Sequence, residues 1–162
     1  MNIFVLDYDI EKAARYHCDA HVVCMVKEYS QLLSSAHFLS GSWNTSMTKP
    51  THLRHPCLLW ATESKENYQW LKQLYFELAW EYRLRYSRVH LSFSKHWEVL
   101  KKIPELPSLG LSEFALAMPE ELKVKGNAVQ SYRNFYNVSK ASFAKWKYPS
   151  ETPPWFNPTF GC

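Results

Sequence analysis

The chain has 162 residues, of which 46% are apolar and 16% aromatic, so it is long enough to bury one core and too apolar to be disordered. Four glycines stand against seven tryptophans and ten tyrosines, which disfavours a turn-rich β-sandwich and favours large side chains packed between helices. The net charge is +4 and 14 of the 19 Lys/Arg follow residue 64, so the basic excess is C-terminal, as in proteins with a phosphate-bearing partner.

We therefore expect one compact, all-α domain over residues 1–162, with a short extended segment or strand at 3–6. The pattern then predicts a helix over about 10–17 with Asp9 as its N-cap. A longer helix follows from His21 to about Phe38, because apolar residues recur at helical spacing before the stop signal Gly41.

Residues 40–56 are rich in Ser, Thr, Asn, Gly and Pro, and they predict a surface loop that ends at His55-Pro56. The strongest helical pattern follows over about 65–86, with Thr62 or Ser64 as its cap and a regular apolar stripe.

The rest of the chain predicts three shorter or weaker elements before a tail. These are helices over Ser94–Ile103, over Ser112–Met118 and from Gly126 or Asn127 to about Lys147. The tail, Pro149 to Cys162, contains four prolines, and we expect it to be extended and packed on the domain through its aromatic residues.

The N-terminal apolar run is short and has no basic leader, which argues against a signal peptide. No stretch reaches the roughly 20 apolar residues of a membrane helix, so we expect no membrane partner and a cytoplasmic location.

Polar side chains share one face of the predicted second helix: His17, His21, Cys24, Glu28, Gln31 and Ser35. The opposite face is apolar, so the helix would dock through it and present the polar row to a cleft or to solvent. Carboxylates and an imidazole at this spacing can divide acid and base roles, which makes Asp19, His21 and Glu28 the candidate catalytic residues. An ordinary solvated face, with Asp19 as a helix cap, is the alternative.

Candidate substrate contacts come from several segments. Asn2 and Gln31 are two of these candidates, and His55 ends the long loop. Trp60 and Tyr68 are aromatic residues that could hold a base.

A basic group, Arg83, Arg85 and Arg88, ends the strongest helix, where it could bind phosphates or complement the helix dipole. Lys145, with neighbouring lysines and aromatics, extends this predicted phosphate-binding surface. The sequence has no Gly-rich phosphate loop, no Gly-x-Ser-x-Gly elbow, no His-Glu-x-x-His and no paired Cys-x-x-Cys motif. We accordingly expect neither a cofactor nor a metal ion.

Several segments resemble a small uncharacterised protein family of tailed phages. They are Met1-Asn2-Ile3-Phe4-Val5-Leu6-Asp7, Cys18-Asp19-x-His21-Val22-Val23, His55-Pro56-Cys57-x-x-Trp60, Asn67-Tyr68-x-Trp70-Leu71, Glu81-Tyr82-x-x-Arg85-Tyr86 and Phe143-Ala144-Lys145-Trp146. More remotely, residues 1 to 90 are similar to pyrimidine-dimer DNA glycosylases of the endonuclease V type. The shared order is Asp19, His21, Glu28, Gln31, Leu33, His55, Pro56, Trp60, Glu81, Tyr82 and Arg85.

The resemblance implies a compact helical protein that grips a bent duplex, flips out a nucleotide and cleaves its glycosidic bond with an N-terminal amine and a glutamate. This chain departs from that pattern. Its Asn2 is bulky enough for Met1 to be retained, and Val22 stands near the expected glutamate, so Asp19 or Glu28 would have to serve. Ala20 and Cys24 replace lysines usual in the phage family.

The first functional hypothesis is therefore a DNA-glycosylase-like protein that acts on a nucleobase or its N-glycosidic bond, with DNA as its partner. The second is a non-catalytic phage accessory module that binds nucleic acid or a host defence protein. The third is an enzyme on free nucleotides, which would need a closed pocket.

Overall fold

The computed structural model describes residues 1–158, and within them the fold is all-α, as predicted, with six α-helices and no β-strand. The chain order is α1 (Ile10–Tyr16), α2 (Asp19–Leu39), α3 (Pro56–Glu63), α4 (Lys65–Tyr86), α5 (Leu91–Leu100), the short 3-10 helix η1 (Glu120–Leu122), α6 (Ala128–Phe135) and the π-helix η2 (Tyr136–Lys140). No helix in the described part of the chain is both long and apolar enough to cross a membrane.

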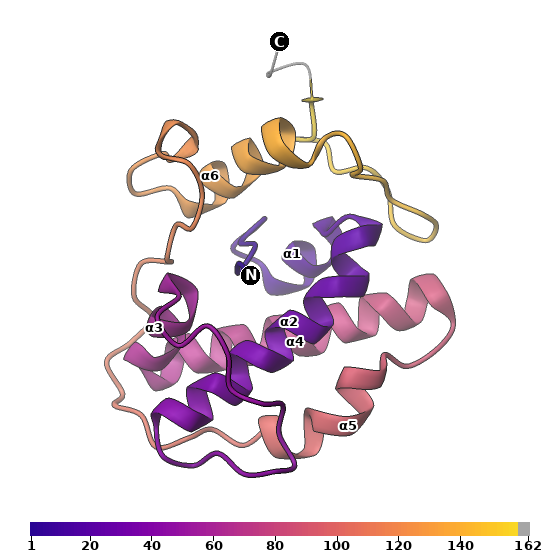
Figure 1. Cartoon of the computed structure of the whole chain (residues 1–162). Helices are drawn as coiled ribbons and strands as arrows, with labels where there is room; N and C mark the ends of the chain where they lie inside the picture. The colour runs from indigo at the N-terminus through magenta and orange to yellow at the C-terminus, as the bar shows by residue number, and fades with distance from the viewer. Residues whose placement is uncertain (159–162) are drawn as a thin grey trace.

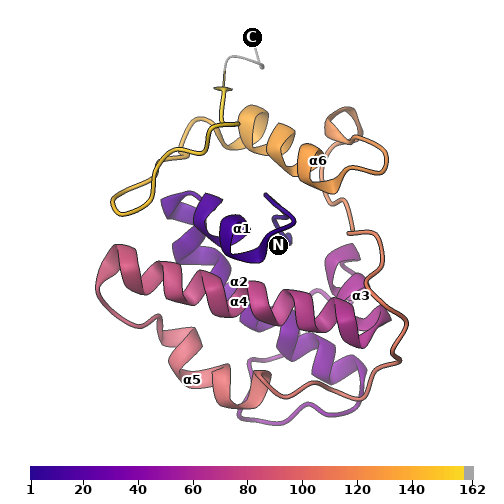
Figure 2. The ribbon, with the colours of Figure 1, turned by 180° about the vertical axis from the view of Figure 1, so that it is seen from behind.

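Helices α2 and α4 pack against each other and form the main layer, with α3 and α5 against α2 and α1 against α4. In two opposite views, the N-terminal segment lies between this layer and α6 (Figures 1 and 2). Residues 3–6 are buried and not helical, with a tight turn in which the Leu6 N–H donates to the Phe4 carbonyl at 3.0 Å, so the segment predicted as a strand or an extended lead-in is a central part of the core.

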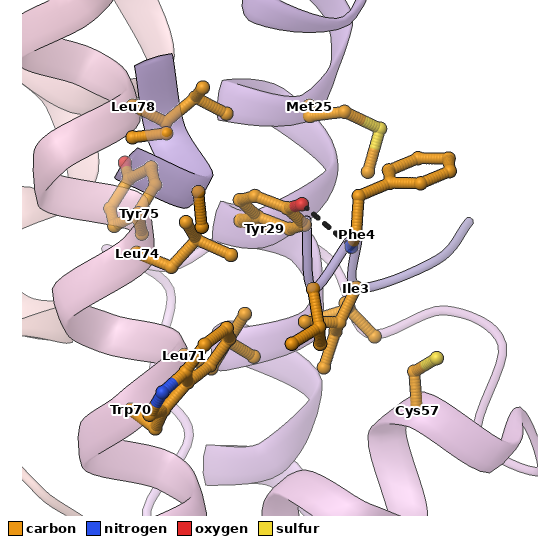
Figure 3. Packing of buried hydrophobic residues seen from close by; sticks show 14 of the residues in the cluster. Ile3, Phe4, Met25, Tyr29, Cys57, Trp70, Leu71, Leu74, Tyr75 and Leu78 are labelled. Carbon is orange, nitrogen blue, oxygen red and sulfur yellow. Dashed lines mark hydrogen bonds between the residues drawn. The ribbon is translucent and has the colours of Figure 1, made fainter. Parts of the chain in front are cut away.

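The buried N-terminal segment has no strand partner within the described chain, and side chains satisfy part of its backbone. The Phe4 N–H donates to the Tyr29 hydroxyl at 3.2 Å, and the Leu6 carbonyl accepts from Nε of Arg133 at 2.9 Å. Figure 3 shows the first of these bonds, with Ile3 and Phe4 beside Met25 and Tyr29 of α2. Because an unpaired buried backbone group is costly, these two side chains fix where the segment can lie.

The helix caps explain why three of the elements begin where they do. Asp9 accepts from the Lys12 N–H and caps α1, and Ser64 accepts from the Asn67 N–H and caps α4, both as predicted. The N-cap of α2 is Cys18, without a side-chain bond, so the alternative in which Asp19 caps this helix is wrong.

Two predicted helices differ from the structure. Residues 112–118 are not helical, because the Asn67 amide oxygen accepts from the Ser112 N–H and the Tyr132 hydroxyl donates to the Ala115 carbonyl. The helix predicted to run to Lys147 instead ends as α6 and the π turn η2 at Lys140. Asn, Val and Ser at 137–139 are weak helix formers, which favours this ending.

Two shorter elements also shift. Helix α5 begins earlier than the predicted Ser94 because His90 caps it by accepting from the Ser92 N–H. Helix α3 interrupts the stretch between the loop and α4, where no separate helix was predicted. In the tail, Trp155 is partly buried against the core, and residues 159–162, including Cys162, lie outside the described residues.

His17 anchors the Tyr29 hydroxyl that holds Phe4. Its Nδ1 donates to the Ala13 carbonyl at 2.7 Å, and Nε2 lies 2.9 Å from the Tyr29 oxygen. Burial lowers the pKa of His17 to about 3, so the ring is neutral and Nε2 can accept from the hydroxyl, while that oxygen accepts from Phe4.

This neutral histidine predicts acid sensitivity. The pKa of His17 is about 3 in the fold but near 6.5 when unfolded, so only the unfolded state binds the proton between these values. Its contribution to stability is complete above pH 6.5 and is lost as the pH falls towards 3. In denaturant titrations over this range, His17→Gln should reduce the slope of unfolding free energy against pH by up to about 1.4 kcal/mol per unit.

The exposed histidine His52 supplies the matched control, because His52→Gln should leave that slope unchanged. An unaltered slope in His17→Gln would contradict the neutral Tyr29–His17 bond.

Candidate active site around the Met1 amine

The structure brings the amino group of Met1 to 3.7 Å from Oε2 of Glu28. Residues Ile3 to Leu6, which follow Asn2, are buried. The chain that leads to the amine is therefore fixed in position. The Glu28 side chain is 31% exposed, which leaves it accessible from solvent. Of the three predicted catalytic residues, Glu28 is the one that meets this amine.

Two histidines lie within the electrostatic reach of the Met1 ammonium. Burial lowers the pKa of His55, and the positive charge of the ammonium lowers it further. His55 also caps α3, with Nδ1 accepting from the Cys57 N–H at 3.2 Å. The predicted substrate-binding residue His55 is therefore a neutral, half-buried group beside the amine.

His21, the second of these histidines, is mostly buried and holds the segment behind the amine. Its Nδ1 lies 2.5 Å from the Tyr136 hydroxyl, and its ring stacks on Phe4 with centroids 4.5 Å apart. Burial lowers the pKa of His21 to about 3, and the positive charges of Lys140 and the Met1 ammonium contribute. His21 is thus neutral, and its observed contacts position Phe4.

Two cysteines interact electrostatically with the Met1 ammonium. Burial, followed by the Glu28 charge, raises the pKa of Cys24 to about 11. Burial raises the pKa of Cys57, whose Sγ lies 4.0 Å from Oδ1 of Asn2. Since the thiolate is the nucleophilic form of cysteine, the amine and the carboxylate are the more reactive pair here.

Asp19 and Arg85 lie in a separate ion-pair network. The Arg85 guanidinium is buried and bonds to Asp19 Oδ1 at 2.9 Å, to Glu81 Oε1 at 2.8 Å and to the Arg15 carbonyl at 2.9 Å. Asp19 also accepts from the Lys147 N–H. These contacts occupy each guanidinium nitrogen, so Arg85 is not free to bind a DNA phosphate, and Asp19 lies with Arg85 rather than with the amine.

Trp60 and Tyr68 belong to the core. Trp60 is 2% exposed and packs against Trp70 and Phe114. Tyr68 is fully buried and donates to the Leu100 carbonyl at 2.9 Å. Neither ring is available to stack on a base, which corrects the predicted role of both residues.

The other predicted substrate contacts are accessible. Arg83 and Arg88 are exposed at the end of α4, where Arg88 Nε donates to the Tyr82 hydroxyl, and Lys145 is exposed after η2. Gln31 is half-buried on α2, one turn beyond Glu28.

The pairing of Met1 with Glu28 had no signal in the sequence pattern. The polar row on α2 singled out Glu28, but no spacing rule links it to a residue at the start of the chain. The hydroxyls of Tyr29 and Tyr136, which fix Phe4 and His21, were also missed, because a buried tyrosine cannot be told from an apolar core residue until its partner is known.

No protein-family model, curated protein or solved structure matches the chain. Function is therefore inferred from geometry and chemistry. Within residues 1–158, no group of three or more His, Cys, Asp or Glu is arranged to hold a metal ion.

The Arg85 network predicts a large stability effect that is separate from the amine. Arg85→Met would leave the nearly buried Glu81 carboxylate without its cation, and the free energy of unfolding should fall by about 3 kcal/mol. Arg83→Met, two residues away on the exposed side of α4, should cost less than about 1 kcal/mol. Chemical denaturation of both variants measures the difference, and equal losses would argue against the network.

Proposed function

We propose that this protein is a DNA-glycosylase-like enzyme in which the Met1 amine attacks C1′ of a deoxynucleotide and Glu28 serves as the acid and base. The observation that supports this proposal is the 3.7 Å separation between the amine and the Glu28 carboxylate. Glu28 accordingly takes the role that the sequence left open between Asp19 and Glu28.

The proposed reaction needs no oxidant or cofactor. Glu28 accepts a proton from the ammonium, and the amine lone pair then forms an N–C1′ bond. The bond from C1′ to the base breaks, its electron pair leaves with the base, and the base takes up the proton held by Glu28. The nitrogen then gives a proton to Glu28 and its lone pair forms a C=N bond as the C1′–O4′ bond breaks, and O4′ takes that proton from Glu28. Water hydrolyses this imine to the C1′ aldehyde and releases the amine.

The carboxylate has a second role in this reaction. Positive charge develops on the sugar as the base departs, and a fixed negative group stabilises such charge. The burial of residues 3–6 supports this role, because it keeps the amine beside Glu28 before the substrate arrives.

Basic segments adjoin the helix that contains Glu28. The Asp19 N–H donates to the Lys145 carbonyl at 2.8 Å, and Nε2 of His90 lies 3.0 Å from the Val23 carbonyl. The exposed Lys145 and Arg88 are therefore near the first turns of α2, and with Arg83 we assign them to DNA phosphates.

The non-catalytic module remains a second candidate, and it too would use DNA or a host defence protein as its partner. The exposed cations that we assign to DNA phosphates could bind DNA without the Met1 amine. Asp19, Trp60 and Tyr68, which were predicted to act on a substrate, instead make contacts within the protein.

The decisive prediction concerns covalent capture. With DNA that contains abasic sites, borohydride should reduce the imine and link the protein to DNA through Met1. Glu28→Gln should lower the rate of capture by about 100-fold or more, because it removes the acid and base. Glu98→Gln, an exposed acid on α5, should not alter it.

A removable tag placed before Met1 gives an independent test, because it should abolish capture, and cleavage immediately before Met1 should restore it. Intact mass of the cleaved protein verifies the free amine. DNA binding without capture by a protein with a verified free amine would overturn the enzyme proposal in favour of the binding module. If free nucleotides gave covalent capture or base release and DNA gave neither, the result would support the third hypothesis, an enzyme that acts on free nucleotides.

A second prediction concerns salt. Replacing Arg83, Arg88 and Lys145 by Gln should weaken DNA binding uniformly across sequences. It should also reduce the slope of log affinity against log salt by about one unit for each phosphate that is no longer neutralised. Lys123→Gln removes a cation that is paired with Glu120 and should have little effect. An unchanged slope in the triple variant would contradict the assigned surface.

A further inference from the structure

A cavity of about 540 Å³ lies on the side of α6 that faces away from the N-terminal segment. Gln130 and Asn134 line it from α6, whereas Tyr132 and Phe135 of the same helix pack on Phe4. The cavity is therefore distinct from the amine site. Its volume is within the range of small-molecule pockets, roughly 300–1,000 Å³.

The described lining of the cavity is neutral, with carboxamides as its main polar groups: Gln130, Asn134, Asn137 and Asn157. Leu122 and Val138 add apolar surface. In a chain of net charge +4, a polar cavity with no cation among its described lining residues disfavours a phosphate and favours a neutral ligand.

Hydrogen bonds inside the protein orient two of these amides. Gln130 Nε2 donates to Asn134 Oδ1 at 2.8 Å, and Asn134 Nδ2 donates to the Leu122 carbonyl at 3.3 Å. A carboxamide has two N–H groups and two lone pairs on its oxygen, so both side chains retain capacity for a ligand. A recognition site requires polar side chains that are held in a fixed orientation and can still form hydrogen bonds with a ligand.

Trp155 contributes a group that lacks a partner. Its carbonyl accepts from Asn137 Nδ2 at 3.3 Å, but its indole N–H is buried and has no hydrogen-bond partner among the described residues. The Trp60 indole N–H in the core is likewise buried without a described partner, so we assign the Trp155 N–H no contact with a ligand, and Trp155 lines the cavity through other parts of the residue.

The backbone beside the cavity is unusual as well. Asn137 and Val138 belong to the π-helix η2, and π turns are rare and frequently occur at functional sites. The wider turn places these two residues at the cavity.

From these observations we propose that the cavity binds a neutral nucleobase. The edge of a base presents adjacent donors and acceptors that a carboxamide can pair with through two hydrogen bonds. The apolar faces of the base would lie against Leu122 and Val138. The base could belong to a free nucleoside or to a nucleotide of DNA, and both present the same edge.

Two-dimensional NMR of the full chain tests this site through the tryptophan indole and side-chain amide signals. Adenosine, guanosine, cytidine, thymidine, a short single-stranded oligonucleotide and glucose are titrated separately. We expect at least one nucleoside to give a saturable shift of the Trp155 indole N–H. A shift with the oligonucleotide alone would assign the base to a DNA chain.

Substitutions of the lining residues test whether the NMR shift comes from binding in this cavity. Gln130→Leu combined with Asn134→Leu should weaken binding at least tenfold, because it removes both oriented carboxamides. Gln73→Leu, an exposed amide on α4, is the matched control. Should the double variant not fold, each single variant should still weaken binding measurably, and unchanged binding in both single variants would contradict the proposal.

The absence of a shift with every base, or an equal response to glucose, would overturn the proposal. Glu28→Gln should leave nucleobase binding unchanged, so this result is independent of covalent capture at Met1.

Discussion

The burial of a non-helical N-terminal segment is the constraint on which the other features of the fold depend. Residues 3–6 have no neighbouring strand in the part of the chain that the structure describes, so side chains from distant helices must supply hydrogen bonds to their backbone. Tyr29 of α2 and Arg133 of α6 do so, and Phe4 lies against both helices. The separate layers formed by α2 with α4 and by α6 are thereby joined through one short segment, and the Met1 amine acquires a fixed position.

Local sequence patterns predicted the elements whose signals are local. The apolar stripe and the Ser64 cap located α4 to the residue, and Asp9 located the start of α1, because both signals lie within a few residues of the helix end. The coil at 112–118 depends instead on hydrogen bonds with the side chains of Asn67 and Tyr132, which are distant in the sequence. A pattern within one segment cannot contain such distant partners.

The same distinction applies to the site. The helical wheel grouped six polar side chains as one face, but the structure buries His17, His21 and Ser35 among them, because a wheel cannot distinguish a side chain that pairs within the protein from one that remains accessible. Asp19 and Arg85, both predicted to act on substrate, neutralise each other, whereas Glu28 meets the amine at the start of the chain. Trp60 and Tyr68 illustrate the corresponding ambiguity of aromatics, which pack a core as readily as they stack on a base.

The two buried histidines connect the stability of the protein with its proposed chemistry. His17 and His21 are neutral because burial lowers the pKa of each to about 3, so neither adds a positive charge beside the Met1 ammonium. A second fixed cation would compete for the Glu28 carboxylate and would oppose positive charge on an approaching sugar. Both rings also hold the N-terminal segment through Tyr29 and Tyr136. Protonation would therefore loosen the segment and alter the charge around the amine together, so that the fold and the site depend on the same protonation state.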